Sequence, residues 1–533
     1  MNLKVTTRGS ASEAVATVVP ELVAGKIASR IFSKDATIWG PDAQAESSIR
    51  LGWVDAAPES LQLLPELTAL RNEHRSKGLT RIVLCGMGGS SLAPEVIAAT
   101  AGVELVVLDS TYPSQVISAV SEGIQNTVVV VSSKSGSTVE TDSQKRAFEQ
   151  AFEIAGIEKT ERIIIVTDPD SPMHKQAVLD GYRVFLANPN VGGRFSALTA
   201  FGVVPSALAG VDMEPILLDA ISATETLSKD IVTNPALVLG SALARSSSGR
   251  VLKDKIGIVP VSTQIVGFGY WMEQLIAEST GKIGRGVLPV VLEQDSPELR
   301  TQPKDLLTVG LVNDTSDTPF DVSVSGSLGG QLLLWEVATA VAAKLLGVNP
   351  FDQPDVESAK IASRAFLENK SDKESPLFED LGIEVSAKSL VLNNTTSLEG
   401  ALKELLASAA EDSYFAVHAY LDRNRDSEFE NLRQLIAQAT NRPTTFGWGP
   451  RFLHSTGQYH KGGPSQGVFL QIIGEEDSDL MVPGRDFGFQ ELMNSQAAGD
   501  ANVLANSGRP VLTLRIKHIE QSHETLTRIL KAL

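Results

Sequence analysis

The sequence predicts an α/β protein built from two doubly wound units, with mainly parallel sheets and helices on both faces. Two observations predict this class. From about residue 80, short runs of β-branched residues alternate with helical patterns, and the same alternation returns after residue 236. The runs also lack the polar alternation of a strand that has one face in water, which is typical of parallel strands buried on both faces.

The first unit is expected between residues 80 and 235. Its predicted strands are 81–85, 103–109, 127–133 and 161–168. Its predicted helices begin near Ser90, at Pro113, at Thr138 (ending near Ala155) and near Met173. Helical patterns then dominate from Ser196 to Ser248.

The second unit is expected over residues 236–533, and residues 1–79 are expected to form a helical or extended arm. Predicted strands of the second unit are 255–262, 305–314, 414–421, 467–474 and 510–516. Predicted helices are 265–280, 328–347 and 396–410.

Length and charge narrow the class of protein. A chain of 533 residues is too long for one compact core. Its net charge of −18 argues against nucleic-acid and membrane-surface partners, and requires a local positive site for any anionic substrate.

Cysteine content and apolar segments point to the cytoplasm. The single cysteine, Cys85, excludes an intrachain disulfide and CxxC metal patterns, and is expected to be a buried strand residue. The N-terminal residues lack the apolar core of a signal peptide. The apolar stretch 328–346 contains Glu336 and Lys344, so a buried helix explains it better than a membrane span.

The first candidate site is the segment CGMGGSSLAP, Cys85 to Pro94, where a predicted strand turns into a predicted helix. Glycines at 86, 88 and 89 allow the backbone to approach an anion, and the helix start at Ser90 and Ser91 offers free N–H groups. A nucleotide-binding turn without its third glycine, with Asp109 downstream, fits the same residues, as does a plain turn with a serine cap.

The second candidate site is SSKSGSTVET, Ser132 to Thr141, which follows the strand run TVVVV. Hydroxyls at 132, 133, 135, 137 and 138 surround Lys134 and Gly136 at another helix start. A cap needs one hydroxyl, whereas five with a lysine suit a phosphate monoester. Both turns follow strands of one parallel sheet, at the edge where open α/β sheets bind ligands, so the pair predicts a site for a compact dianion.

These residues resemble the phosphoglucose isomerase family. GMGGSSLAP, SSKSGSTVET and GGRFSALTAFG (192–202) are similar, in order, to three stretches of that family. QLIAESTGK (274–282) resembles its Q-x-x-x-E-S-x-G-K segment, and NPFDQPDVESAK (349–360) resembles its F-D-Q-x-x-V-E-x-x-K segment. The resemblance covers roughly residues 50–365.

The resemblance implies two sugar-isomerase (SIS-type) domains and the reversible isomerisation of glucose 6-phosphate to fructose 6-phosphate, in glycolysis and gluconeogenesis. It implies a sugar-phosphate substrate, no cofactor and no metal. The implied substrate-binding residues are Gly89, Ser90, Ser133, Lys134, Ser135, Thr138, Gln274 and Gln353. The implied catalytic residues are Arg194 beside the reacting carbons, Glu278 as the base, and Lys360 in ring opening.

The family's ring-opening histidine has no counterpart between Gly284 and Asn349. The nearest match is LHSTGQYHKGG (453–463), so the role is carried to His454, with His460 as the competitor. This order resembles the isomerase half of proteins that also carry a transaldolase. In the related family the histidine comes from the neighbouring subunit, so a homodimer with a shared site is favoured over a histidine that acts in its own chain.

The chemistry of the isomerisation suits these residue types. A carboxylate held in a dry pocket can move one proton between C2 and C1, a guanidinium stabilises the enediolate, and a histidine titrates near neutrality for ring opening. The plainer explanations are a solvated Glu278, an ion-paired Arg194 and a hydrogen-bonded core His454. His454 and His460 lack carboxylates at ligand spacing, which disfavours a metal. Alternatives are an isomerase that also accepts mannose 6-phosphate, a non-catalytic sugar-phosphate-binding regulator and a dehydrogenase.

Overall fold

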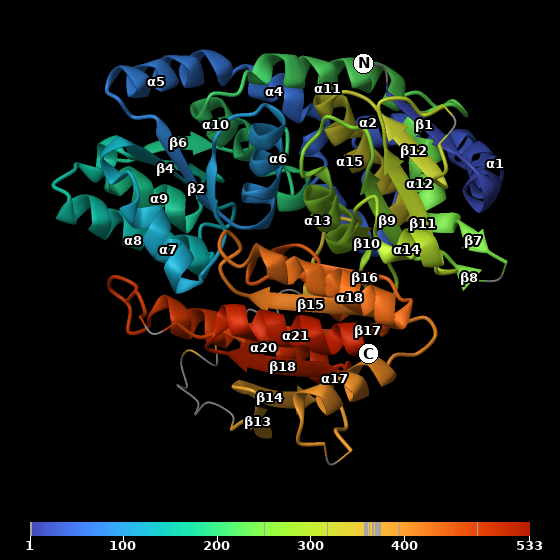
Figure 1. Ribbon diagram of the computed structural model, residues 1–533. Helices are drawn as coiled ribbons and strands as arrows, with labels where there is room; N and C mark the ends of the chain where they lie inside the picture. The colour runs from blue at the N-terminus through green and yellow to red at the C-terminus, as the bar shows by residue number, and fades with distance from the viewer. Residues whose placement is uncertain are drawn as a thin grey trace.

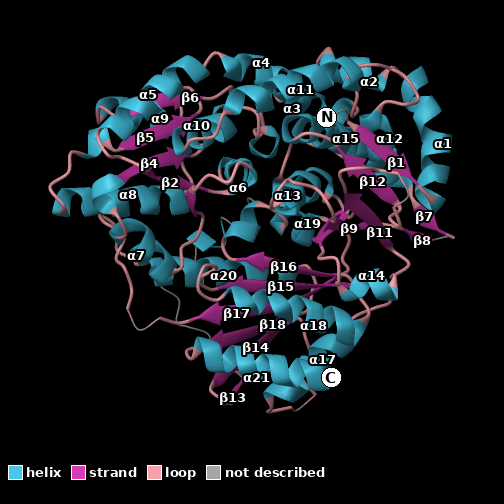
Figure 2. Cartoon of the chain, turned by 45° about the horizontal axis from the view of Figure 1, so that its top comes forward, coloured by secondary structure: helices cyan, strands magenta, loops and turns pink. Residues whose placement is uncertain are grey.

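The computed structural model describes residues 3–533 except 250, 317, 356–360, 362, 365–366, 368–374, 394 and 477. Its described strands form three sheets of five or six strands and a small hairpin. In Figure 1 the first sheet lies at the upper left, the second at the upper right and the third below both. Figure 2 shows the same arrangement from a tilted view, with α6 and α13 between the first two sheets.

The first sheet has the order β3-β2-β4-β5-β6 and is parallel throughout. Its strands are β2 (Arg81–Gly86), β3 (Val106–Leu108), β4 (Thr127–Ser132), β5 (Ile163–Thr167) and β6 (Arg183–Leu186). The helices around it are α5 (Leu64–Ser76), α6 (Leu92–Thr100), α7 (Pro113–Ser121), α8 (Val139–Ile154), α9 (Pro172–Leu179) and α10 (Ala200–Ala209).

Both faces of this sheet are buried, because successive side chains of a strand point to opposite sides. Leu84 of β2 and Val130 of β4 pack into a core with residues of α6 and α10. Their neighbours Cys85 and Val131 pack on the other side, with Phe148 of α8. The predicted doubly wound unit is therefore confirmed, and so is the buried strand position of Cys85. The short edge strand β6 was not predicted.

The second sheet has the order β1-β12-β11-β9-β10, with only β1 antiparallel. Its strands are β1 (Lys4–Thr7), β9 (Lys255–Pro260), β10 (Leu288–Val291), β11 (Leu306–Leu311) and β12 (Val322–Ser325). The helices near it are α1 (Gly9–Ala24), α11 (Met213–Leu227), α12 (Pro235–Arg245), α13 (Phe268–Thr280) and α15 (Leu328–Leu346). The N-terminal residues thus supply a strand of this sheet.

The third sheet has the order β13-β14-β18-β17-β15-β16, parallel from β18 to β16 and antiparallel at β13 and β14. Its strands are β13 (Phe378–Asp380), β14 (Ile383–Lys388), β15 (Tyr414–Tyr420), β16 (Thr444–Trp448), β17 (Gly467–Gly474) and β18 (Val511–Ile516). Its helices are α17 (Leu398–Ala407), α18 (Asn431–Thr440), α19 (Gly457–Gly462), α20 (Phe489–Asn506) and α21 (Ile519–Ala532).

Shorter elements connect these parts. They are α2 (Ile27–Phe32), α3 (Pro41–Ser47), α4 (Ala56–Leu61), α14 (Pro297–Thr301), the hairpin strands β7 (Ser247–Ser248) and β8 (Val251–Leu252), and single 3₁₀ turns. Two of these turns, Gly193–Phe195 and Arg451–His454, bear on the site below.

The α/β class with mainly parallel sheets is confirmed. The expected second unit, residues 236–533, is divided in the structure between two sheets, because no described strand at 255–325 pairs with a described strand at 378–516. The domain limits of 79 and 235 stay a prediction. Within the described residues no helix is both long and apolar enough to cross a membrane.

Glu336 lies fully buried in α15, and neither carboxylate oxygen has a hydrogen-bond partner in the described part of the chain. Burial therefore raises the pKa of Glu336 well above its ordinary value, which favours the neutral carboxyl in the folded protein. In the unfolded chain it ionises above about pH 4.3. Stability from this site is thus greatest in acid and falls as pH rises from that value toward the folded pKa.

Replacing Glu336 by Gln, which cannot ionise, is expected to raise the melting temperature at pH 7 by about 2–5 °C. The difference from the parent should shrink toward pH 4.5. Thermal melts of both proteins at several pH values check this, and a difference independent of pH contradicts a neutral Glu336.

Candidate active site

The glycines of the turn after β2 let three backbone segments meet. A Cβ on Gly89 would lie 1.9 Å from the carbonyl oxygen of Gly193, and one on Gly88 would lie 2.6 Å from that of His454. Gly88 also has φ +55°, which favours glycine. The turn therefore packs backbone against backbone, and Ser90 lies buried behind it.

The turn after β4 presents its hydroxyls to a cavity. Thr138 is the N-cap residue of α8, yet its side chain makes no capping hydrogen bond. Instead the Ser133 hydroxyl donates to Thr138 Oγ1 over 3.2 Å. Gly136, at φ +66°, packs against Met173 where a Cβ would lie 2.8 Å from that residue. The hydroxyls and the helix start are thus left available to a ligand, as the sequence predicted.

Lys134 of this turn forms an ion pair with Asp168, at the end of β5. Burial lowers the pKa of Lys134 and raises the pKa of Asp168, and each charge opposes the shift of the other. Removing this ion pair from water therefore costs free energy of desolvation. A bound anion would compensate the charge of the lysine.

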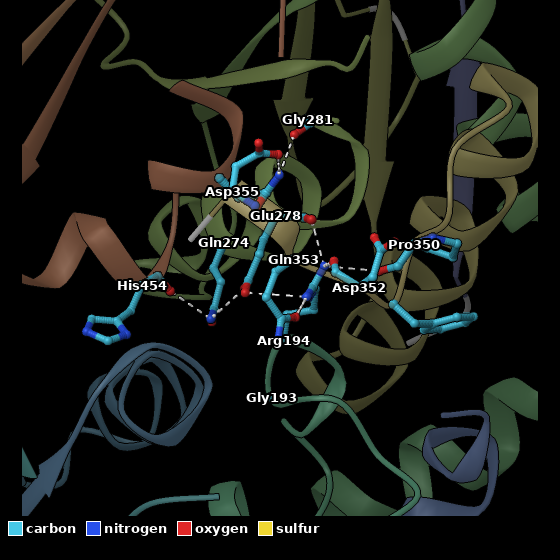
Figure 3. A network of polar contacts seen from close by, with 12 residues as sticks. Gly193, Arg194, Gln274, Glu278, Gly281, Pro350, Asp352, Gln353, Asp355 and His454 are labelled. Atoms are coloured by element: carbon cyan, nitrogen blue, oxygen red, sulfur yellow. Dashed lines mark hydrogen bonds and ion pairs between the residues drawn. The ribbon is translucent and has the colours of Figure 1, made fainter. Parts of the chain in front are cut away.

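Arg194 and Glu278 lie side by side at the centre of the polar network in Figure 3. Nη2 of Arg194 is 3.4 Å from Glu278 Oε1 and also donates to Gln353 Oε1. Nη1 donates to the carbonyl oxygens of Glu278, Pro350 and Asp352 over 2.6, 3.1 and 3.1 Å. Arg194 is only 3% exposed, and burial lowers its pKa. It therefore holds Glu278 and the segment 350–353 together.

Gln274, one turn before Glu278 in α13, ties the carboxylate to His454. Its Nε2 donates to Glu278 Oε2 over 3.1 Å and to the carbonyl oxygen of His454 over 2.9 Å (Figure 3). The side chain of Glu278 is 12% exposed, so it is neither a surface residue nor sealed from a ligand. The solvated alternative for Glu278 is excluded by this position.

His454 ends the 3₁₀ turn Arg451–His454, and its Nε2 lies 2.8 Å from Oε1 of the buried Glu140. Gln496 of α20 donates to the same oxygen over 2.7 Å. A buried carboxylate fixes the orientation of the imidazole that it contacts. His460 instead lies buried in α19, with Nδ1 2.9 Å from the Tyr414 hydroxyl, and burial holds its pKa well below the ordinary value.

One cavity of about 380 Å³ collects the predicted site residues. Its lining includes Gly89, Ser90, Ser133, Lys134, Ser135, Thr138, Gln274, Glu278, Gln353 and His454. Arg194 lies beside Glu278 rather than on the cavity wall, and its neighbour Gly193 lines the cavity. His460 is not among the lining residues, and Lys360 lies outside the described residues.

The histidine belongs to the same chain as the rest of the cavity, which corrects the favoured expectation of a site shared between subunits. The carbonyl of His454 packs on Gly88 and Gln274, and its ring contacts Glu140. The third sheet therefore completes the site from within the chain.

Met87, Gly88 and Ser132 of the two candidate segments also line this cavity. Arg50, Asp168 and Gly193 line it as well, and none of these three was named as a site residue from the sequence. Asp168 had a signal, since it ends the strand run ERIIIVTD at the same sheet edge. Arg50 had none, because nothing in its neighbourhood resembles a binding motif. A larger cavity of about 900 Å³ lies between β3 and residues 422–425, and none of the predicted site residues lines it.

Lys282, two residues beyond the C-terminus of α13, contacts the segment that precedes Gln353. Its Nζ is 2.8 Å from Asp352 Oδ1 and donates to the Asn349 carbonyl. Burial lowers the pKa of Lys282 to about 7, with the nearby Arg194 charge acting in the same direction. Together with Arg194, it fixes the segment that carries Gln353.

Comparison with known proteins agrees with this geometry. A model of the phosphoglucose isomerase family matches residues 69–287, which include the turns after β2 and β4, Arg194 and Glu278. The probable glucose-6-phosphate isomerase of Haloarcula marismortui is 26% identical over 354 residues, covering 56% of this chain and 80% of that protein. The glucose-6-phosphate isomerase of Citrifermentans bemidjiense is 27% identical over 350 residues, covering 54% and 66%.

Among solved structures, the glucose-6-phosphate isomerase of Chlamydia trachomatis aligns with a TM-score of 0.52 at 18% identity, over 66% of this chain and 79% of that one. This likeness shows the fold. The matched segments carry both turns, Arg194 and Glu278 in the order and geometry described, so the chain is similar to the phosphoglucose isomerase family over residues 69–287.

Proposed function

We propose that the protein is an aldose–ketose isomerase that interconverts glucose 6-phosphate and fructose 6-phosphate through a cis-enediol intermediate. The observation that carries the proposal is the shared cavity. A hydroxyl-lined turn, Glu278 and His454 all line one space of about 380 Å³. That volume suits a hexose phosphate.

The phosphate group is assigned to the turn after β4 and the turn after β2. Ser133, Thr138 and Ser90 supply hydroxyl donors, and Lys134 supplies a positive charge. The start of α8 adds N–H groups that Thr138 leaves uncapped. These groups anchor the substrate so that its C1 and C2 reach Glu278, which makes the proton transfer effectively intramolecular.

Glu278 is assigned the transfer of one proton between C2 and C1. Gln274 holds Oε2 and Arg194 lies next to Oε1, so the carboxylate is fixed in orientation before substrate enters. The proton leaves C2 as the enediolate forms and returns to C1 from the same carboxyl group. Arg194 carries a permanent positive charge close to this centre, which stabilises the negative charge that develops on oxygen.

His454 is assigned the opening of the sugar ring, which must precede the proton transfer. The Glu140 carboxylate contacts Nε2 of this histidine and orients its ring. Family resemblance assigns Lys360 to the same step.

A coupled assay on fructose 6-phosphate, repeated with mannose 6-phosphate, tests the proposal. Formation of glucose 6-phosphate from the first substrate alone is expected. Turnover of both would make the enzyme a dual phosphoglucose/phosphomannose isomerase, and turnover of neither would contradict the proposal and leave a sugar-phosphate-binding role.

Location and assembly follow from the same proposal. The reaction belongs to glycolysis and gluconeogenesis, so we place the enzyme in the cytoplasm. We also propose a homodimer, on the general frequency of twofold oligomers, with each site built within its own chain. Light scattering on the purified protein measures the assembly.

Replacing Ser133 and Thr138 together by Ala is expected to raise KM by about two to four orders of magnitude while changing kcat much less. Each hydrogen bond to a charged acceptor contributes roughly 1.5–3 kcal/mol to binding. Steady-state kinetics and inhibition by phosphorylated sugar acids measure the loss. Ser137→Ala is the matched control, because Ser137 lies in the same turn but does not line the cavity. Unchanged inhibition in the double variant would show that the anion binds elsewhere.

A further inference from the structure

Arg50 brings a second cation to the cavity from a part of the chain with no predicted site residue. It follows α3 by three residues and lines the cavity together with Ser133, Lys134 and Thr138. Its side chain is 26% exposed, so the guanidinium is reachable from solvent.

Arg50 and Lys134 converge on one oxygen. Nη1 of Arg50 donates to the Pro189 carbonyl over 3.0 Å, and Nζ of Lys134 lies 3.4 Å from the same oxygen. Two positive groups that share one carbonyl repel each other, and an anion between them removes that cost. Each already has a single carboxylate nearby, Glu46 for Arg50 and Asp168 for Lys134.

The backbone holds Arg50 firmly in this place. Leu51 forms an antiparallel bridge with Val191, and the N–H of Gly52 donates to the Asn190 carbonyl over 3.0 Å. A Cβ on Gly52 would lie only 3.0 Å from that same oxygen, so glycine permits the close approach. Backbone contacts therefore join the segment 50–52 to the loop 189–191, and they position Arg50 relative to the cavity.

The guanidinium still has donors to offer. Its bond to Glu46 uses Nε (2.7 Å) and its bond to Pro189 uses Nη1, which leaves Nη2 for an incoming ligand. In a chain of net charge −18, a second cation beside the phosphate turn also raises the local potential that attracts an anion.

We propose that Arg50 is a phosphate-binding residue, which together with Lys134 contacts the outer oxygens of the phosphate group while Ser133 and Thr138 contact the inner ones. The fork of donors on a guanidinium matches a phosphate dianion. The inference deepens the proposed function and rests on it for the sugar, whereas the phosphate monoester itself follows from the donors described.

The test titrates the purified full chain with inorganic phosphate by calorimetry. Arg50→Gln is expected to raise the Kd for phosphate about tenfold, which corresponds to one hydrogen-bonded charge. Arg50→Lys keeps the charge without the fork and should weaken binding less. The matched control is Arg183→Gln, which removes an equal charge from a surface arginine that pairs with Glu66 and does not line the cavity.

In kinetics, Arg50→Gln should raise KM for glucose 6-phosphate by a similar factor, with kcat within twofold of the parent. Phosphate affinity in Arg50→Gln within twofold of the Arg183→Gln control would overturn the inference. If Arg50→Gln does not fold, phosphate affinity of Arg50→Lys equal to the parent's overturns it instead. A parent that binds phosphate through Arg50 yet does not isomerise sugar would leave this inference standing and refute only the proposed function.

Discussion

Glu278→Gln is expected to bind sugar phosphate normally and to lose about three to four orders of magnitude in kcat. The amide keeps the shape of the side chain and its contact with Gln274 and Arg194, but it cannot accept a proton from C2. Because the proton transfer takes place only in the transition state, the loss should appear in kcat rather than in KM. Steady-state kinetics with an independent measurement of ligand affinity separates the two.

Glu273→Gln is the matched control, because Glu273 is a buried carboxyl in the same helix. Burial raises the pKa of Glu273 to about 8, so it is mainly neutral at pH 7, and it lines a separate cavity. Its replacement by the neutral isostere should leave turnover nearly unchanged. If Glu278→Gln retains a tenth of the parental turnover, the assignment of this residue as the base is refuted.

His454→Ala is expected to slow turnover of cyclic glucose 6-phosphate by about two to three orders of magnitude. Proton exchange on the open-chain form should be affected much less, since the imidazole is assigned to ring opening alone. Glu140→Gln should show a smaller loss of the same kind, because it removes the charge that orients the ring. His460→Gln should be the mildest, since that ring lies outside the cavity. Full activity of His454→Ala on the cyclic substrate would refute its assignment.

Mixing Glu278→Gln and His454→Ala chains after joint refolding distinguishes a site within one chain from a shared one. In the structure Glu278 and His454 line one cavity of a single chain, so a hybrid assembly built from such sites would contain no intact site and should stay inactive. Recovered activity would show that the histidine is exchanged between subunits.

The turns of the first sheet could be predicted because their signals are local. A buried strand, glycines and hydroxyls at a helix start together specify both the backbone and the ligand. The separate third sheet could not be predicted, because the strands 414–420 and 255–260 are both mainly apolar and buried, and their sequences do not show which sheet each belongs to. Which of them pair is decided by packing between residues far apart in sequence.

The same limit applies within the site. His454 could be named from its motif. Its position beside the cavity of its own chain depends on contacts with Gly88 and Glu140, which lie more than 300 residues earlier in the sequence. Arg50 could not be named at all, because its role depends on the carbonyl of Pro189, which it shares with Lys134. Lys360 lies outside the described residues, so its assignment stays a prediction from the family.

Proton NMR of the unmodified protein with fructose 6-phosphate in D₂O tests the central claim most directly. If Glu278 carries a proton between C1 and C2 through an enediol, glucose 6-phosphate should form with deuterium at C2, because part of the carboxyl protons exchange with solvent before they return. If glucose 6-phosphate forms with no deuterium at C2, a transfer through a base whose proton exchanges with solvent is excluded. If no conversion occurs at all, the assigned reaction is contradicted.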